Sequence, residues 1–266
     1  MSSYECHIGQ FSLMTSLLNV LNEKDLESPS YALARYFLQR FDRLDRLNIY
    51  DVAEECFVSR SGIQRFCKSI GFDTFSKMKY ASTVERDLYK TTYIAYGRRA
   101  DFRDYARQAM NEMIAELEAQ ADREDLPGLA KMLHDSRNVV LLSAECSSMA
   151  PRDLQQELLA SGKLVHLVTD SHPDFELLQS LTEDDLVVVC SITGNYAYAL
   201  NDSITRIQGP RKVLVTLNRD SLFARSYHRI LYLSETANDH QRSVFTKYGM
   251  AYFLDLLYNA YLRQYG

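Results

Sequence analysis

The spacing of the hydrophobic residues changes near residue 100, and this change limits the folds that the chain can adopt. Up to about residue 90, apolar residues recur every three or four positions, which is the period of amphipathic helices. Beyond that point, short apolar runs alternate with helical stretches. The sequence therefore predicts an all-α domain over residues 1–90, a linker over residues 91–100, and an α/β domain over residues 101–266.

The apolar runs of the second domain have the length of buried strands. They are Val139–Leu142, Leu164–Val168, Leu186–Cys190, Lys212–Leu217 and Ile230–Leu233. Helical stretches separate them, and strands that alternate with helices are typical of βαβ units. We expect a three-layer fold with a parallel sheet, closed by a long apolar helix over Gly249–Gln264.

The charge is distributed unevenly along the chain. The formal net charge of −5 argues against a nucleic-acid partner. However, the segment from Arg60 to Arg99 holds 9 basic and 3 acidic residues, a local net charge of +6. A basic stripe on an otherwise acidic protein is typical of a separate nucleic-acid-binding domain.

Composition and motifs exclude several classes of protein. No run approaches the ~18 consecutive apolar residues of a membrane helix, and Met1 to Gln10 lacks the features of a signal peptide. Five scattered cysteines without a Cys-x-x-Cys pair favour reduced thiols, and therefore a cytoplasmic protein. Nucleotide-binding, hydrolase and metalloprotease motifs are absent, so we expect no catalytic residues, no cofactor, no metal and no membrane partner.

Two short helices around a tight turn are predicted over about residues 49–69. Asn48 and Ser59 can cap their N-termini, and Gly71 can end the second helix. This is the geometry of a helix-turn-helix, which places its second helix in the major groove of DNA. Phe57 occupies a turn position where glycine is common, which counts against this interpretation.

The second of these helices carries polar side chains suited to DNA. Arginine and glutamine can pair with base edges, whereas lysine and serine suit phosphates. The predicted DNA-binding residues are Ser59, Arg60, Ser61, Gln64, Arg65, Lys68, Lys77 and Lys79. A small helical bundle with solvated basic residues would show the same spacing, so spacing alone leaves both interpretations open.

The residues around this helix add a family resemblance. The run from Val58 to Phe75, V-S-x-x-x-I-x-R-F-C-K-x-x-G-F-x-x-F, resembles the RpiR family of bacterial transcriptional regulators. The resemblance implies a double-stranded DNA operator and a C-terminal SIS (sugar isomerase) domain that binds phosphosugars. It also implies a homodimer or homotetramer and a role in regulating sugar metabolism.

Two loops of the second domain match the places where SIS domains hold phosphate. The loop from Ser191 is similar to the family's S-x-S-G-x-T loop, whereas the loop from Ser143 lacks the family's glycines and contains Glu145. The resemblance suggests as phosphosugar-binding residues Ser147, Ser148, Ser191, Thr193, Gly194 and Asn195. A modified anionic-sugar site and a degenerate site both remain open, and these serines can also serve as helix caps.

A phosphosugar isomerase or sugar-binding enzyme with an accessory helical domain is the alternative function. An isomerase of the SIS type needs a glutamate and a histidine near the sugar, and the histidines here are scattered. His240 with Arg242 is the only pair that the sequence singles out. We therefore expect a regulator that is not an enzyme.

Overall fold

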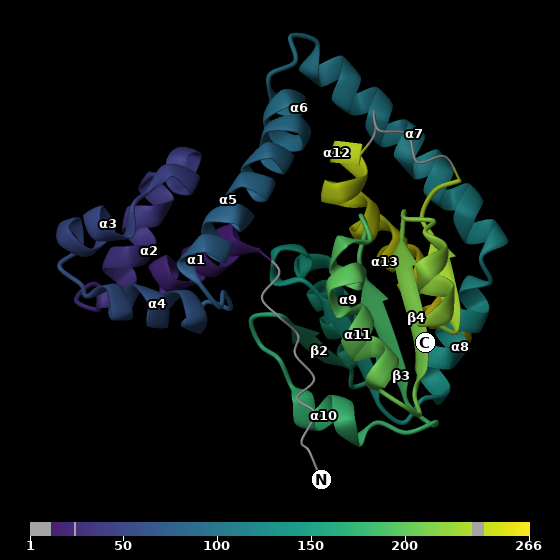
Figure 1. The fold of residues 1–266 in the computed structure, drawn as a ribbon. Helices are drawn as coiled ribbons and strands as arrows, with labels where there is room; N and C mark the ends of the chain where they lie inside the picture. The colour runs from purple at the N-terminus through teal and green to yellow at the C-terminus, as the bar shows by residue number, and fades with distance from the viewer. Residues whose placement is uncertain (1–11, 24, 236–241) are drawn as a thin grey trace. The chain divides into compact units, whose positions relative to one another are not determined.

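The computed structural model describes residues 12–23, 25–235 and 242–266 (Figure 1). It divides the chain into two compact units, with the boundary between Arg99 and Ala100. His240 lies outside the described residues, as does the side chain of Arg242, so the pair that the sequence singles out is not described.

The first unit consists of helices throughout its described part, as the sequence predicts. They are α1 (Leu13–Asn22), α2 (Pro29–Gln39), a 3-10 helix (Phe41–Arg46), α3 (Ile49–Glu55), α4 (Arg60–Ser69) and α5 (Phe75–Tyr89). Hydroxyl side chains cap several of them, since Ser12, Ser28 and Thr74 accept a hydrogen bond from a backbone N–H in the first turn of α1, α2 and α5.

Aromatic rings hold the core of this unit together. The ring of Phe37, on α2, lies 6.0 Å from that of Phe66 on α4 and 5.9 Å from that of Phe75 on α5. All three are buried, together with Ile63 and Met78. These contacts fix the face that α4 turns inward and hence the face that it turns to solvent.

The region expected to be a linker is mostly helical. After α5 the chain continues through a π-helical turn (Lys90–Ile94) and α6 (Ala95–Gly97). Thr92 and Tyr96 are buried and stand four residues apart, so the helical period persists beyond residue 90. The non-helical part of the junction is therefore shorter than residues 91–100, and it begins after Gly97.

The second unit is an α/β fold, as the sequence predicts. Its strands are β1 (Val139–Ser143), β2 (His166–Thr169), β3 (Leu186–Cys190), β4 (Arg211–Thr216) and β5 (Arg229–Tyr232). Its longer helices are α7 (Phe102–Arg123), α8 (Leu126–Asp135), α9 (Met149–Ala160), α10 (Phe175–Ser180), α11 (Asn195–Arg206) and α13 (Met250–Tyr265), with short turns over Glu145–Ser147, Ser221–Arg225, Arg242–Val244 (α12) and Phe245–Gly249.

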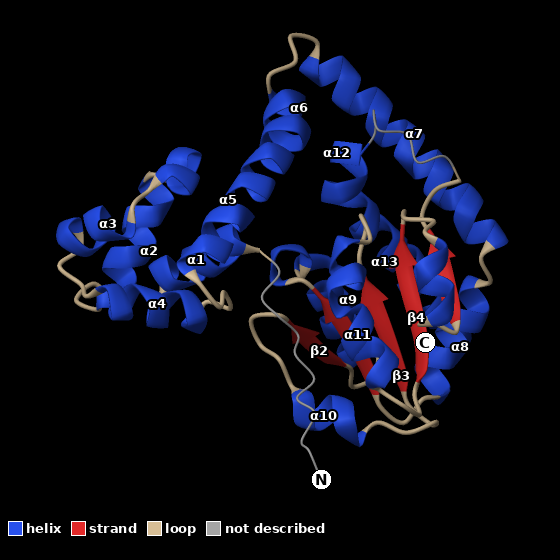
Figure 2. Ribbon diagram, viewed as in Figure 1, coloured by secondary structure: helices blue, strands red, loops and turns tan. Residues whose placement is uncertain are grey.

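The five strands form one parallel sheet in the order β2-β1-β3-β4-β5. Helices cover both faces of this sheet and give three layers (Figure 2). For this strand order, the right-handed crossovers that parallel strands favour put α9 on one face and α10 and α11 on the other. Helix α13 packs against α8 and α9. Ser143 at the end of β1 is in register with Thr169 of β2 and Cys190 of β3. The loops that follow these three strands therefore emerge together at one edge of the sheet.

At the opposite edge, Asp185 ties β3 to the segment that precedes β1. Its fully buried carboxylate accepts hydrogen bonds from the N–H of Thr182 at 2.7 Å and from the N–H of Asn138 at 3.0 Å. The guanidinium of Arg137 lies 3.3 Å from the same carboxylate. Burial raises the pKa of this carboxyl, but the hydrogen bonds from Thr182, Arg137 and Asn138 outweigh it and bring the pKa to about 2.

We expect Asp185→Asn to destabilise the protein by about 2 kcal/mol at pH 7, because charged hydrogen bonds are lost. Since folding lowers the pKa of Asp185, its contribution is present above the unfolded pKa of about 3.9 and is lost as the pH falls toward 2. Denaturant unfolding at pH 7 and pH 3 measures this. The difference between the two proteins should shrink at pH 3, and an equal difference at both pH values would contradict the assignment.

Candidate nucleic-acid interface and effector site

The helices α3 and α4 are joined by a tight turn whose local interactions match the predicted caps. The side chain of Asn48 accepts a hydrogen bond from the N–H of Tyr50 at 3.0 Å, and Ser59 accepts one from Gly62 at 3.1 Å. Between the helices, the N–H of Val58 donates to the carbonyl of Ala53 at 3.0 Å. The two helices therefore have the arrangement of a helix-turn-helix.

Phe57 adopts the backbone conformation that glycine usually supplies in such a turn. Its φ is +53°, which is the left-handed region, and its side chain is 95% exposed. Phe57 is the one residue other than glycine with a positive φ among those that the structure describes. The turn therefore keeps the helix-turn-helix geometry despite an unfavourable residue, and the packing of the two helices must offset the strain.

The outward face of α4 presents two basic side chains that have no partner. Arg65 and Lys68, one turn apart, are exposed, and their side chains make no hydrogen bond or ion pair within the described chain. Near the start of the helix, Arg60 donates a hydrogen bond to the hydroxyl of Tyr50 at 3.0 Å, and its guanidinium lies 4.9 Å from the centre of that ring. Ser61 shares a hydrogen bond with Ser59.

Three of the predicted DNA-binding side chains are engaged inside the domain. Gln64 is half-buried, and its carbonyl oxygen accepts a hydrogen bond from the N–H of Phe75 at 3.3 Å, which joins α4 to the start of α5. Lys79 donates to the carbonyl of Leu47 at 2.8 Å, and Lys77 forms an ion pair with a neighbouring aspartate. Arg65 and Lys68 are thus the side chains with the most freedom to contact a ligand.

In the second unit, the loops after β1 and β3 lie side by side because their strands are paired. The loop after β3 is rigidly held. Ser191 accepts a hydrogen bond from the N–H of Ala197 at 3.2 Å, and Thr193 accepts one from Asn195 at 3.4 Å. Gly194 has a φ of +80°, and a Cβ there would come within 2.7 Å of Asn218. These two hydroxyls cap the first turn of α11. They can bind a ligand as well only if the same hydroxyls also face that ligand.

The loop after β1 has its backbone donors turned inward. The N–H of Ser147 donates to Ala144 at 2.9 Å, and that of Ser148 donates to Glu145 at 3.2 Å. The hydroxyl of Ser148 donates to the same Glu145 carbonyl at 2.9 Å. The backbone N–H groups of both serines and the hydroxyl of Ser148 therefore stabilise the loop itself, whereas the side chain of Ser147 is exposed.

Glu145 occupies the middle of this edge with partners from three segments. Its carboxylate accepts a hydrogen bond from the hydroxyl of Thr169 at 2.6 Å and lies 3.6 Å from Nδ1 of His172 and 3.9 Å from Arg152. Its backbone N–H donates to the carboxylate of Asp170 at 2.7 Å. The loop where a phosphate is expected therefore holds the carboxylate of Glu145 and binds that of Asp170 through a backbone N–H, and these negative charges disfavour a dianion.

Sequence reasoning missed several of these residues. Tyr50 contacts the start of α4, and Asp170 and His172 follow β2 directly. The signal for the last two was their position after a predicted strand, because the carboxyl ends of neighbouring parallel strands meet at one edge. Across the described ranges, no three metal-binding side chains gather into a cation site, and no helix has the length and apolarity to cross a membrane.

Comparison with known proteins agrees with this geometry. The family model described as "Helix-turn-helix domain, rpiR family" matches residues 16–87, which contain the whole of α3, the turn and α4. Residues 16–87 therefore match a helix-turn-helix domain of the RpiR family. The sequence resemblance is thereby confirmed for the helix-turn-helix.

Relatives extend over the second domain as well. An uncharacterised helix-turn-helix transcriptional regulator of Clostridium perfringens is 24% identical, over 91% of this chain and 92% of its own length. Another from Escherichia coli is 23% identical, over 94% of this chain and 93% of its own. Helix-turn-helix transcriptional regulators of similar overall length are thus the relatives that this chain resembles.

Solved structures with low identity resemble the chain too. Vibrio vulnificus NanR, solved with ManNAc-6P, is 19% identical, covers 96% of this chain and 92% of its own, and has a TM-score of 0.49. The sugar isomerase domain of an RpiR transcription factor from Sphaerobacter thermophilus is 17% identical, covers 59% of this chain and 89% of its own, and has a TM-score of 0.45.

We expect Phe57→Gly to stabilise the RpiR domain by about 0.5–1 kcal/mol. A left-handed residue with a Cβ costs about 1–2 kcal/mol, of which the flexibility of glycine in the unfolded chain offsets part. The side chain of Phe57 is exposed, so little burial is lost. Thermal and denaturant unfolding of the full chain measure the change.

The control is Phe57→Ala, which removes the same ring and keeps the strained backbone. It should leave the free energy of unfolding within a few tenths of a kcal/mol of the wild type. If alanine stabilises the domain as much as glycine does, the strain lies in the side chain and not in the backbone.

Proposed function

We propose that the protein is a cytoplasmic DNA-binding transcriptional regulator of sugar metabolism, and that α4 reads its operator. The observation that carries this proposal is the outward face of α4, where Arg65 and Lys68 are exposed without internal partners. An exposed basic helix that is fixed from behind by buried residues can enter the major groove without rearranging the domain.

The other predicted contacts have supporting roles. Ser59 and Ser61 lie at the N-terminus of α4, where side-chain hydroxyls and the helix dipole suit a backbone phosphate. Arg60, stacked on Tyr50, is held at the same end. Gln64 keeps its NH₂ group available for a base edge, even though its carbonyl oxygen is used by Phe75.

A homodimer or homotetramer would present two such helices to a near-palindromic operator. Two-fold symmetry in the protein then sets the spacing of the half-sites. The C-terminal domain is the proposed oligomerisation and effector domain. An effector that binds two arrangements of the subunits with different affinity would shift the equilibrium between them.

The proposed effector site is the edge formed by the loops after β1, β2 and β3. Ser191, Thr193, Gly194 and Asn195 supply polar groups at the start of α11, and the resemblance of this loop to SIS domains suggests a sugar ligand. Glu145 gives the site a negative group, so a phosphorylated sugar must either bring a cation or bind weakly.

An enzymatic function has one observation in its favour, which is the proximity of Glu145 to His172. An isomerase of the SIS type uses these residue types near the sugar. The pair sits at a loop whose backbone N–H groups at Ser147 and Ser148 are bonded within the loop, and we propose that the protein does not turn over sugar. Product formation from a panel of phosphosugars would separate the two functions.

We expect Arg65→Ala and Lys68→Ala each to weaken DNA binding by about 1–3 kcal/mol, because contacts to bases or phosphates are lost. A lost phosphate contact should also reduce the slope of log K against log salt by about 1. The measurement is a titration of the full chain with a fragment selected from genomic DNA, at several salt concentrations.

Lys90→Ala is the matched control, since it removes an exposed positive charge of the same domain that lies outside α4. Lys90→Ala should weaken DNA binding by no more than the loss of any charge that lies away from the interface. If all three variants bind DNA as the wild type does, or if Lys90→Ala weakens binding as much as Arg65→Ala, α4 is not the reading helix.

We expect Glu145→Gln to strengthen the binding of inorganic phosphate at the effector site at least tenfold. Two like charges about 4 Å apart repel by about 1 kcal/mol even at the dielectric constant of water, and phosphate carries nearly two charges. Glutamine keeps an oxygen for the hydrogen bond from Thr169. Calorimetric titration with phosphate measures the affinity.

Glu157→Gln serves as the control because it also removes one carboxylate charge. Glu157 lies on α9 about eight residues beyond the first residue of the helix, and hence ~12 Å from that end along the helix axis. The variant should leave phosphate affinity unchanged. Equal gains in both variants would mean that the net charge of the domain, and not Glu145, sets the affinity.

A further inference from the structure

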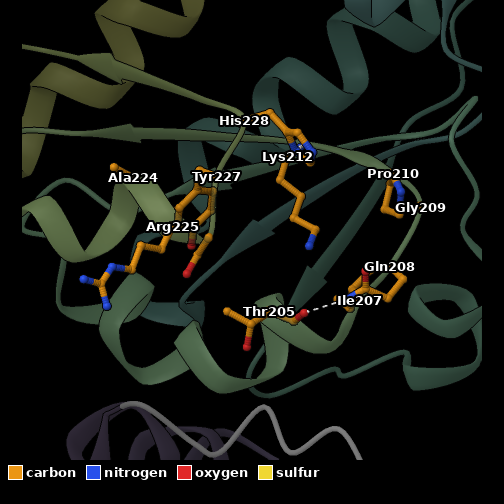
Figure 3. A pocket seen from close by; sticks show the side chains of 11 residues that line it. Thr205, Ile207, Gln208, Gly209, Pro210, Lys212, Ala224, Arg225, Tyr227 and His228 are labelled. Atoms are coloured by element: carbon orange, nitrogen blue, oxygen red, sulfur yellow. Dashed lines mark hydrogen bonds between the residues drawn. The ribbon is translucent and has the colours of Figure 1, made fainter.

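A pocket lies at the edge of the sheet opposite the proposed effector site. It is formed by the end of α11, the turn before β4 and the segment that joins the Ser221–Arg225 turn to β5, and its volume is about 400 Å³. Figure 3 shows Lys212 extending from β4 into the space that the other lining residues surround, whereas Arg225 points away from it. This volume is sufficient for a small metabolite.

Lys212 is unusually buried for a lysine. It is 7% exposed, because it occupies the second position of a strand that is covered on both faces. Its Nζ donates one hydrogen bond, to the carbonyl of Ile204 at 2.8 Å. Burial lowers the pKa of this ammonium.

The hydrogen bond to Ile204 accounts for only part of what an ammonium requires. It caps a carbonyl in the last turn of α11, which is a favourable place for a cation. However, an ammonium has three donors, and the Nζ of Lys212 makes no second hydrogen bond and no ion pair within the described part of the chain. Two donors are therefore left to the pocket.

The charges around the pocket are unbalanced. Lys212 is the positive side chain that points into the pocket, and no aspartate or glutamate is among the residues that form it. His228 accepts a hydrogen bond from the N–H of Lys212 through Nδ1 at 3.0 Å, which leaves Nε2 as a donor. Because a buried charge is costly without a partner, a positive pocket without internal carboxylates is suited to an anion from solution.

We propose that this pocket binds a small oxyanion, phosphate or carboxylate, through the Nζ of Lys212. Nε2 of His228 and the amide of Gln208, which also donates to the carbonyl of Thr205 at 2.9 Å, provide further donors at its wall. The site is separate from the loops after β1 and β3, since it lies at the amino ends of β4 and β5. The chain would therefore carry two ligand sites on one domain.

The test uses the full chain and two probes, inorganic phosphate and acetate, in calorimetric titrations at constant ionic strength. We expect one of them to bind saturably, and the probe that binds identifies the class of oxyanion. Lys212→Met should weaken this binding at least tenfold, because methionine preserves the buried stem and removes the charge. Lys131→Met, which removes an exposed charge of the same unit, should leave it unchanged.

A second measurement does not depend on the folding of a variant. In the wild-type protein, modification of Lys212 by an amine-reactive reagent, mapped by mass spectrometry, should be slowed by the bound anion and not by chloride at equal ionic strength. Absence of saturable binding for both probes would overturn the proposal. Binding that persists in Lys212→Met, or that leaves the modification rate of Lys212 unchanged, would also overturn it.

Discussion

The packing of α4 against the core of the helical domain is the interaction on which the proposed function depends. Ile63, Phe66 and Cys67 are buried on one side of this helix, and the ring of Phe66 contacts that of Phe37. Because one side of α4 packs against the core, the opposite side faces solvent, and it carries Arg65 and other polar residues. The tight turn before α4 completes the geometry at the cost of a strained residue, so the helix is prepared for a groove before any ligand is present.

The same logic of paired elements organises the second domain, but with a different result. Parallel pairing of β1 with β2 and β3 brings three loops to one edge, which is where ligands of open α/β sheets bind. At that edge Glu145 lies among Thr169, His172 and Asp170, whereas the positive charge of Lys212 lies at the other edge. The fold therefore preserves the place for a ligand, and the charges at the two edges decide which ligand each can hold.

The elements of the fold could be predicted because their signals are local. Buried parallel strands are nearly continuous apolar runs in the sequence. The capping residues Asn48 and Ser59 predict where α3 and α4 begin. The partners of individual polar side chains could not be predicted. The carbonyl oxygen of Gln64 is taken by the N–H of Phe75, and Glu145 meets Thr169 across 24 residues of sequence. Such pairings depend on tertiary contacts that no spacing along the chain encodes.

The most direct test of the central claim is the base preference of the full chain, measured by selection from a pool of random DNA duplexes with the wild type and with Arg65→Ala. If α4 reads base edges, the wild type will enrich a near-palindromic site. The variant will then lose preference at one position of each half-site and keep the others. Failure of the wild type to enrich any sequence, or an identical preference in the two proteins, would contradict the account.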